Sequence, residues 1–458
     1  MRSILNFIQQ VLSTPAIFVG LIALLGLALQ KKDAQSIIKG TIKTILGFIV
    51  LNAGAAVIQD AIIPFGNLFQ LAFGVQGVVP NNEAITSLGL NEYAVQTASI
   101  FALGMCANIV LARFSRWKYI FLTGHHALYM SCLIAIILSI AGLGGWQLIV
   151  GGALLLGLIM AFFPAIMQPI IRQVTGDDSL ALGHFGSCCY WLSGQIGKLF
   201  GRKEGTRTTE DVKFPKSLSF LRDNTISIAL AMFACYMVVA GVATVGHYEE
   251  TVEIFGGNNW ILGSVLNSIS FSAGIYIVLA GVRMLIAEIV PAFKGISEKL
   301  VPNAKPALDC PIIFPFAPNA VLIGFLCSFV GGILGLLILA LMGNAGIGAA
   351  IILPGAVVHF FCGATAGVCG NATGGLKGCV VGAFVHGVAV TFLAAGLLPV
   401  LGSLGFANTT FSDADFTIVG ILFGNLAKVV TNNVLFGILA LLFALPIIYN
   451  IAFGKKED

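Results

Sequence analysis

The sequence predicts an all-α protein that crosses a membrane several times, and two features of its composition lead to this fold class. Hydrophobic residues make up 58% of the 458 residues and charged residues only 10%. Soluble domains contain about 45–50% hydrophobic and about 25% charged residues. So few charged side chains cannot cover a soluble surface. The 55 glycines are a second indication, because glycine among apolar residues is typical of closely packed and interrupted transmembrane helices.

Several classes of function are excluded by what the sequence lacks. Its net charge of +4 comes without a basic stripe carrying interleaved aromatic residues, so we expect no nucleic-acid partner. The ten cysteines include no CxxC pair, and no Walker loop, GxGxxG or HExxH motif occurs. We therefore expect no metal, no cofactor and no enzymatic activity of its own in this chain, and we expect membrane lipid around it.

Ten runs with few or no charged residues are the candidate membrane segments. They lie at 11–30, 44–59, 94–112, 119–146, 147–171, 224–246, 258–282, 311–342, 378–402 and 417–453. Some of these runs are longer than one span. The first follows Arg2 without a small-residue cleavage site, so we expect a spanning helix there and not a signal peptide.

The distribution of lysine and arginine predicts the orientation of the chain. Basic residues gather at 31–43, 113–118 and 198–223, whereas the acidic segments 247–253 and 404–416 contain none. The positive-inside rule places the basic loops in the cytoplasm. We therefore expect the amino terminus outside and the carboxyl terminus inside, which requires an odd number of spans. About eleven spans fit the apolar length if two re-entrant hairpins are added.

Three segments differ from simple spans. In 33–46, four isoleucines share one helical face and two lysines share another. In 283–301, apolar and charged residues also alternate at helical spacing. Both segments therefore resemble amphipathic helices on the membrane surface. Their parallel positions predict an inverted repeat of the kind found in secondary transporters. The segment 345–376 is rich in Gly, Cys and Asn and contains His359. It is predicted to re-enter the membrane beside a cavity.

Polar residues in so apolar a chain are the candidates for function. His125 and Tyr129 stand four residues apart, so on a helix they share a face and can meet one ligand. The alternative is a pair of histidines at a helix start that bonds lipid headgroups or backbone. His184 lies between Gly183 and Gly186, which permit a close approach of backbone to a small molecule. Its alternative is a histidine in an interfacial loop.

Asp309 is the most informative single residue. Four prolines at 306–318 exclude a regular helix around it, and a carboxylate beside a broken apolar segment is a candidate for binding sugar hydroxyls or a proton. A helix cap is the alternative. Asn82 and Glu83 are similar candidates, for which the alternative is a solvated turn. The glycine-rich run 363–375 either exposes backbone groups to a ligand or packs helices together.

Four strings, taken together, resemble a known family. They are IIKGTIKTILGFIVLNAGAAVI at 37–58, LTGHH at 122–126, GVRMLIAEIVPAFKGISEKLVP at 281–302 and DCPIIFPFAPNAV at 309–321. Together they resemble the ascorbate-specific permease, the EIIC component of the bacterial phosphoenolpyruvate-dependent sugar phosphotransferase system, and the similarity covers essentially the whole chain. The resemblance implies one membrane-integral permease domain over residues 1–458, in a homodimer of eleven-span subunits. It also implies an elevator-like motion of a substrate-binding core against a scaffold.

The resemblance implies a set of substrate-binding residues as well. These are Asn82, Glu83, His125, His126, Ala127, Leu128, Tyr129, His184, Phe185 and Asp309. Two of them depart from the family pattern, which has glutamine where this chain has Tyr129 and Phe185. If both side chains point into the site, their aromatic faces replace amide contacts, which favours a flat, conjugated ligand.

The leading functional hypothesis is a permease for L-ascorbate in the bacterial inner membrane, with phosphorylation by a separate cytoplasmic component, EIIB. Asp309 is expected to accept from substrate hydroxyls or to act as a general base, and the basic segment 198–223 to dock EIIB. One alternative is a proton- or ion-coupled secondary transporter that uses Asp309 or Glu288. Another is a phosphotransferase permease for a different sugar acid or polyol. A channel or purely structural protein is disfavoured, because the polar residues gather at several broken segments.

Overall fold

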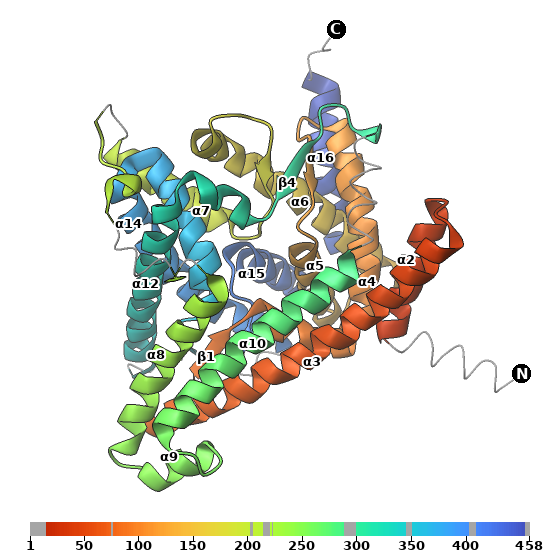
Figure 1. Cartoon of the computed structure of the whole chain (residues 1–458). Coiled ribbons are helices and arrows are strands. Elements are labelled where there is room, and N and C mark those ends of the chain that lie inside the picture. The colour runs from red at the N-terminus through yellow and green to blue at the C-terminus, as the bar shows by residue number, and fades with distance from the viewer. Residues whose placement is uncertain are drawn as a thin grey trace, which may run out of the picture.

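The computed structural model describes residues 15–74, 77–201, 205–213, 220–221, 223–287, 299–344, 350–402 and 409–453. Helices dominate these ranges (Figure 1), and eight of the described helices are long and apolar enough to cross a membrane. This confirms the predicted all-α polytopic membrane protein. Three further apolar helices are shorter than a typical span of about 20 residues: α2 (Pro15–Leu29), α5 (Gly124–Ile140) and α15 (Ala414–Val429). The number of eleven spans therefore stays a prediction.

A layer made of three long helices and one short helix lies along one side of the molecule (Figure 1), and we call it the long-helix layer. It contains α3 (Ala34–Phe73), α8 (Asn224–Thr244), α9 (Tyr248–Ile254) and α10 (Trp260–Ile286), with α10 packed along α3. The 40 residues of α3 give a helix about 60 Å long, which is twice the thickness of a hydrocarbon core of about 30 Å. Helix α3 therefore either tilts strongly or extends beyond the hydrocarbon region.

The predicted amphipathic helix at 33–46 is not a separate helix, and its place on the membrane surface stays a prediction. Asp33 caps the amino end of α3 by accepting a hydrogen bond from the backbone N–H of Ser36 at 3.3 Å, and the helix then continues to Phe73. Its first proline is Pro64, so nothing before that residue removes a helical hydrogen bond. The second predicted amphipathic segment, 283–301, lies largely outside the described residues.

The other elements form two halves with a similar order. The first half contains β1 (Gly77–Pro80), α4 (Asn82–Phe114), β2 (Tyr119–Phe121), α5, α6 (Gly145–Thr175), β3 (Ala181–Leu182) and α7 (Ser187–Phe200). The second contains β4 (Lys305–Leu308), η3 (Cys310–Phe316), α12 (Pro318–Asn344), β5 (Ile351–Ile352), α13 (Ala356–Val358), η4 (His359–Gly363), α14 (Ala364–Leu397), η5 (Leu398–Val400), β6 (Thr409–Thr410) and α15. The short η1 (Thr209–Asp211) lies between the halves, and α16 (Asn432–Phe453) follows them and packs on α6.

The six short strands pair between the halves. Strand β1 lies between β5 and β6 and is parallel to both, while β4 lies between β2 and β3 and is again parallel to both. The first strand of each half is thus inserted between the two later strands of the other half. Such reciprocal pairing is expected of a two-fold structural repeat, and the inverted relation of the halves stays a prediction.

The acidic segment 404–416 behaves differently from the sequence-based expectation. Asp413 and Asp415 in the acidic segment 404–416 are only 3% and 0% exposed, because they hydrogen-bond inside the protein, so their assignment to an outside loop was wrong. The predicted re-entrant segment 345–376 contains β5 and a helical run that is interrupted at Gly375, where φ is 64°. Within that run, Gly367 lies against Gly324 and Gly374 against Gly197. The glycine-rich run therefore packs helices together.

Glycine also sets the contact between α3 and α10, which leads to a stability prediction. A Cβ atom at Gly281 of α10 would lie 2.4 Å from the backbone nitrogen of Leu51, so we expect Gly281→Ala to destabilise the protein by about 1–3 kcal/mol. Gly66 of α3 is a matched control, because a Cβ there meets nothing within 4 Å. There Gly66→Ala should be neutral or stabilising by up to about 1 kcal/mol. Thermal unfolding in detergent measures both, and equal effects would contradict this packing.

Candidate functional site

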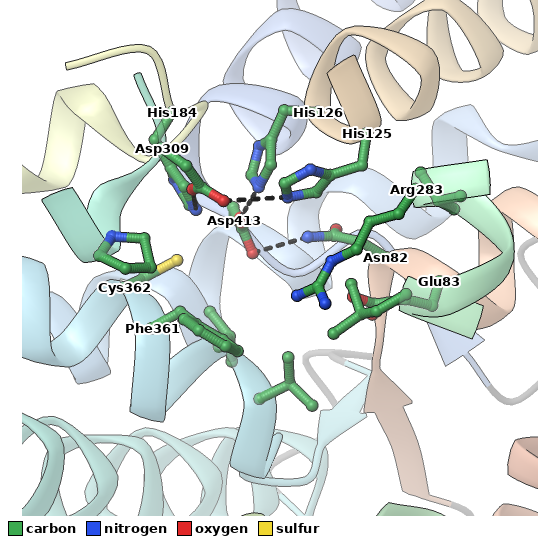
Figure 2. Close-up of a pocket in the computed structure, with 15 residues that line it drawn as sticks. Asn82, Glu83, His125, His126, His184, Arg283, Asp309, Phe361, Cys362 and Asp413 are labelled. Atoms are coloured by element: carbon green, nitrogen blue, oxygen red, sulfur yellow. Dashed lines mark hydrogen bonds and ion pairs between the residues drawn. The ribbon is translucent and has the colours of Figure 1, made fainter. Parts of the chain in front are cut away.

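The carboxyl ends of all six strands meet at one cavity. Residues one to five positions beyond the ends of β1, β2, β3, β4, β5 and β6 line it, and helix α10 supplies one further wall (Figure 2). The cavity has a volume of about 190 Å³ and is lined by Asn82, Glu83, His125, His126, His184, Leu279, Val282, Arg283, Asp309, Pro311, Val357, Val358, Phe361, Cys362 and Asp413. Such a volume suits one small molecule of about the size of a monosaccharide.

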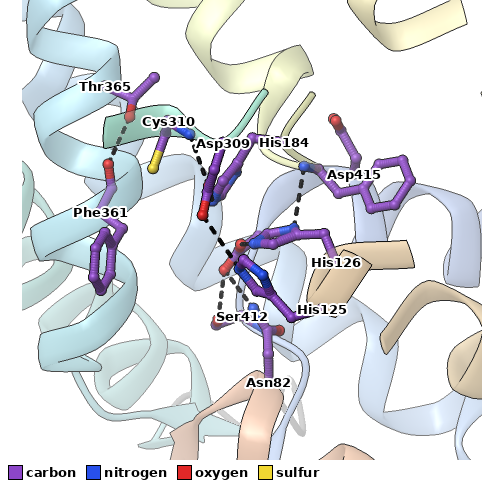
Figure 3. Close-up of polar contacts among 12 residues, drawn as sticks. Asn82, His125, His126, His184, Asp309, Cys310, Phe361, Thr365, Ser412 and Asp415 are labelled. Carbon is purple, nitrogen blue, oxygen red and sulfur yellow. Dashed lines mark hydrogen bonds and ion pairs between the residues drawn. The ribbon is translucent and has the colours of Figure 1, made fainter. Parts of the chain in front are cut away.

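Asp309 lies between two imidazole rings. Its Oδ2 is 3.4 Å from Nε2 of His125, and its Oδ1 is 3.8 Å from Nε2 of His184. The same carboxylate accepts a 2.7 Å hydrogen bond from the backbone N–H of Cys310, so it also caps η3 (Figure 3). Because its side chain remains 38% exposed, Asp309 is both held in place and open to a ligand.

His126 is held in one tautomer by the backbone. The N–H of Phe185 donates to its Nδ1 at 3.3 Å, so the proton of the neutral ring is carried by Nε2. That Nε2 lies 3.9 Å from Oδ2 of Asp413, and the ring packs against His184 with a centroid distance of 3.8 Å. His126 therefore presents an N–H donor on the side of the cavity.

Asp413 is anchored to the end of β1. Its Oδ1 accepts hydrogen bonds from Nδ2 of Asn82 at 2.8 Å and from the hydroxyl of Ser412 at 2.7 Å. The amide oxygen of Asn82 accepts in turn from the backbone N–H of Ser412 at 2.9 Å. Beside this network, Oε2 of Glu83 is buried and has no hydrogen-bond partner among the described residues. The floor of the cavity thus holds two carboxyl groups with acceptor capacity.

His184 is positioned by two supports. Its Nδ1 shares a 2.8 Å hydrogen bond with the hydroxyl of Tyr190. The following helix, α7, begins where Asp415 accepts from the backbone N–H groups of Ser187 and Cys188, at 2.7 and 2.8 Å. A carboxylate at this place satisfies two of the unpaired N–H groups of the helix and favours its dipole. Asp415, far away in the sequence, thereby fixes the loop that carries His184.

The remaining wall comes from the long-helix layer. Leu279, Val282 and Arg283 of α10 line the cavity, and Arg283 is the only lysine or arginine among the described lining residues. In Figure 2 the guanidinium of Arg283 points towards the cavity across from Cys362. The site thus combines imidazole donors, carboxylate acceptors and one cation, which is a combination suited to an anionic, hydroxyl-rich molecule.

Comparison with known proteins identifies the family. The pattern of EIIC-GAT, described as the PTS system sugar-specific permease component, matches residues 10–415. The chain belongs to this family. Its members are transport subunits, and phosphoryl transfer is carried out by other components of the phosphotransferase system. The chain is also 28% identical, over 421 aligned positions, to the ascorbate-specific PTS system EIIC component of Mycoplasma pneumoniae. The match covers 81% of this chain and 62% of the length of that relative.

The structure of this EIIC-GAT permease brings together six of the ten residues predicted for the site: Asn82, Glu83, His125, His126, His184 and Asp309. Four do not line the cavity. Ala127 and Leu128 are buried in the first turns of α5. Tyr129 is 1% exposed and packs edge-on to His125, and Phe185 stacks on Phe121 with a centroid distance of 4.6 Å. The expectation that Tyr129 and Phe185 stack on a ligand therefore does not agree with this structure.

Several lining residues of the permease were missed by sequence reasoning. Asp413 was assigned to an outside loop, although the Ser412–Asp413 pair, one residue after two β-branched threonines, was a signal for a capped strand end. Arg283 ends an otherwise uncharged run, which was a signal for a functional cation. Phe361 and Cys362 were not named individually, but they lie in the segment 345–376 that was predicted to border a cavity. They belong to the π-helical turn η4, and such turns are frequent at functional sites.

Three sets of side chains in the described part of the permease lie close enough to share an ion: His125–His126–Asp309, His126–His184–Asp413 and His184–Asp309–Cys310. The first two need His126. Its Nδ1 is already occupied by the N–H of Phe185 and its Nε2 carries the proton, so neither nitrogen offers a free lone pair. The first two sets therefore suit hydrogen bonding to a ligand better than they suit metal coordination.

The capping role of Asp415 can be tested by stability. Asp415→Ala leaves two buried N–H groups of α7 without an acceptor, each at a cost of about 1–3 kcal/mol, so we expect a clear loss of thermal stability. Asp415→Asn keeps one acceptor and should lose less. The control is Asp177→Ala, because Asp177 is an exposed carboxylate that bonds only Ser179 in its own loop and should change stability by less than about 0.5 kcal/mol. Equal losses for Asp415→Ala and Asp177→Ala contradict the capping role.

Proposed function

We propose that this permease binds L-ascorbate and carries it across the bacterial inner membrane for phosphorylation by a separate cytoplasmic component, EIIB. The observation that carries the proposal is the carboxylate of Asp309, held between His125 and His184 at the edge of one small cavity. The ascorbate-specific relative supports the choice of substrate.

The chemistry of the cavity agrees with this substrate. Ascorbate is a planar monoanion with several hydroxyl groups, so a site for it needs donors, acceptors and one compensating cation. His126 supplies a fixed N–H donor, Asp309 and Asp413 supply acceptors, and Arg283 supplies the positive charge. A neutral open-chain polyol leaves Arg283 without an anionic partner and gains less from a site of this charge.

In the proposed site the six lining residues predicted from the sequence contact the substrate or hold the groups that do. Asn82 orients Asp413, and Glu83 offers an acceptor without a protein partner among the described residues. The other predicted residues act from behind the cavity wall. Tyr129 packs on His125, the backbone of Phe185 fixes His126, and Ala127 and Leu128 fill the first turns of α5.

Asp309 is proposed as the general base of phosphoryl transfer. As the substrate hydroxyl attacks, a new O–P bond forms, the bond between phosphorus and the EIIB residue breaks, and the hydroxyl proton passes to the Asp309 carboxylate. His125 and His184 lie on either side of that carboxylate and keep it directed at the cavity. The phosphoryl group itself comes from EIIB.

The proposed mechanism of transport uses the two parts of the single permease domain, residues 1–458. Helices α3, α8 and α10 act as the scaffold, and the strand-end core carries the substrate. All lining residues except Leu279, Val282 and Arg283 belong to the core, so an elevator-like displacement of the core moves the substrate along α10. Two subunits form the proposed homodimer, as the resemblance implies.

A proton-coupled secondary transporter is the second candidate function, because a carboxylate such as Asp309 can also cycle protons. Glu288, the other carboxylate considered for this role, lies outside the described residues. Uptake of ascorbate into vesicles driven by a proton gradient in the absence of EIIB would support this candidate. Phosphorylation that requires EIIB supports the permease of a phosphotransferase system.

Binding of radiolabelled ascorbate, with hexitols and aldonates as competitors, tests the substrate. Asp309→Asn removes a charged acceptor, and a hydrogen bond to a charged group contributes about 1.5–3 kcal/mol, so we expect at least about a tenfold loss of affinity. Asp60→Asn is the control, because Asp60 is an exposed carboxylate of α3 that does not line the cavity. Tighter binding of a linear polyol than of ascorbate overturns the substrate, and full affinity in Asp309→Asn overturns the site.

The proposed orientation, with the amino terminus outside and the carboxyl terminus in the cytoplasm, has its own test. Arg207 and Glu250 are both exposed and belong to the basic and acidic segments that were assigned to opposite sides. On a cysteine-free background, an impermeant thiol reagent applied to intact cells should label Glu250→Cys and spare Arg207→Cys. The reverse pattern inverts the topology.

A further inference from the structure

In the sheet β2–β4–β3, the edge that lies away from the cavity is basic. These three strands are parallel, and their carboxyl ends lead to His125, Asp309 and His184. Their amino ends therefore lie together at the other edge, where the backbone N–H of Lys305 donates to the carbonyl oxygen of Lys118 at 2.7 Å. The side chains before or at these amino ends are Arg113, Arg116, Lys118, Arg172, Asp177, Asp178 and Lys305, and we call this group the basic edge.

The centre of the basic edge is an unbalanced charge cluster. The carboxylate of Asp178 accepts two hydrogen bonds from Arg172, at 2.7 and 2.9 Å, and it also pairs with the ammonium of Lys305. The Arg172 guanidinium, and secondarily Lys305, hold the pKa of this carboxyl well below its usual range, so Asp178 stays ionised at any pH at which the protein works. One carboxylate shared by two cations leaves a positive charge that is not neutralised within the cluster.

The surroundings add to that positive charge. Arg113 and Arg116 are exposed, and Arg116 is held against α16 by a 2.7 Å hydrogen bond to the carbonyl oxygen of Phe453. The carboxylate of Asp177 is occupied by the backbone and hydroxyl of Ser179. Basic side chains outnumber acidic ones on this edge, so it attracts an anionic surface and raises its rate of association.

The position of the basic edge relates it to the chemistry of the site. Strand β4 connects Lys305 directly to Asp309, and four residues of extended chain span about 13 Å. A phosphorylated protein that docks on the edge therefore brings its phosphoryl group within one strand length of the base. Arginine and lysine are also the side chains that bind phosphoryl oxygens best.

The segment 198–223, which the sequence favoured for docking, keeps Lys198, Arg207 and Lys213 exposed, but its short helix η1 is bonded to the rest of the protein. The backbone N–H of Thr209 donates to Asn371 at 3.0 Å, and Glu210 accepts from the backbone N–H of Asn319 at 2.9 Å. Asp211 bonds the backbone and hydroxyl of Thr208. These groups serve to fold the segment onto α12 and α14.

We propose that the basic edge is the docking surface for the phosphorylated carrier protein, with the cluster of Arg172, Lys305 and Asp178 at its centre. This proposal rests on the proposed function, because it requires a phosphoryl donor that approaches from the cytoplasm. The partner is a protein with an acidic face around a phosphoryl group.

The test measures phosphorylation of ascorbate in inverted vesicles as a function of the concentration of purified, phosphorylated EIIB. Arg172→Gln and Lys305→Gln should each raise the KM for EIIB about threefold, and more at low salt, while kcat changes little. Charge reversal in Lys305→Glu should raise the KM for EIIB by at least about tenfold. Affinity for ascorbate, measured without EIIB, should be unchanged in all three variants.

Asp178→Asn separates docking from a structural role. Removing the carboxylate frees both cations, so docking predicts a lower KM for EIIB, whereas a purely structural cluster predicts the same damage as in Lys305→Gln. Arg207→Gln in the segment 198–223 is the matched control and should leave the KM unchanged.

The outcomes distinguish the two proposals. Suppose that EIIB phosphorylates ascorbate in vesicles with the wild-type permease. The docking surface is then wrong, and the function stands, if Arg172→Gln, Lys305→Gln and Lys305→Glu keep the wild-type KM or if only Arg207→Gln raises the KM. If EIIB at any concentration phosphorylates no substrate in vesicles with the wild-type permease, the proposed function itself fails.

Discussion

The structure depends on one constraint, which is that backbone hydrogen-bonding groups inside an apolar protein must be paired. Six short strands interrupt the helices, and each would leave unpaired N–H and C=O groups in isolation. Parallel pairing of β1 with β5 and β6, and of β4 with β2 and β3, satisfies them. Because the pairs are parallel and join the two halves, the six carboxyl ends converge on one cavity. The same hydrogen bonds that stabilise the irregular backbone therefore assemble the site.

Polar side chains extend this arrangement around the cavity. Asp413 bonds Asn82 across the sheet β5–β1–β6, and Asp415 caps α7, which follows the loop of His184. On the other side, the hydroxyl of Ser328 in α12 lies between Nδ1 of His359 and Nδ1 of His386, at 2.8 and 2.9 Å. One hydroxyl proton serves only one of two imidazoles, so these rings adopt opposite tautomers. This contact ties α12 and α14 to the π-helical turn of Phe361 and Cys362.

Charge is distributed over the molecule in a way that suits transport of an anion followed by phosphoryl transfer. Among the described residues, the cavity holds carboxylates and imidazoles on the core and one lysine or arginine, Arg283, on α10. Under the proposed function, a negatively charged substrate bridges the two parts that are proposed to move relative to each other. The second concentration of positive charge lies at the amino ends of the strands whose carboxyl ends lead to Asp309, the proposed base. One set of strands therefore connects the surface to the chemistry.

The sequence by itself determined the membrane class, the family resemblance and six of the lining residues, including Asp309 and both histidines of the LTGHH string. These features are local, because hydropathy, proline content and short motifs are legible along the chain. Tertiary structure alone decided the roles of Asp413, Asp415, Arg283 and Phe185. From the sequence, Asp413 is expected in a loop, but the pairing of β6 with β1 places it at the cavity. Phe185 is expected to contact the ligand, but its ring stacks on Phe121. Asp413, Asp415 and Phe185 have partners far away in the sequence, which strand pairing between the two halves brings close. Arg283 reaches the cavity because α10 packs along it.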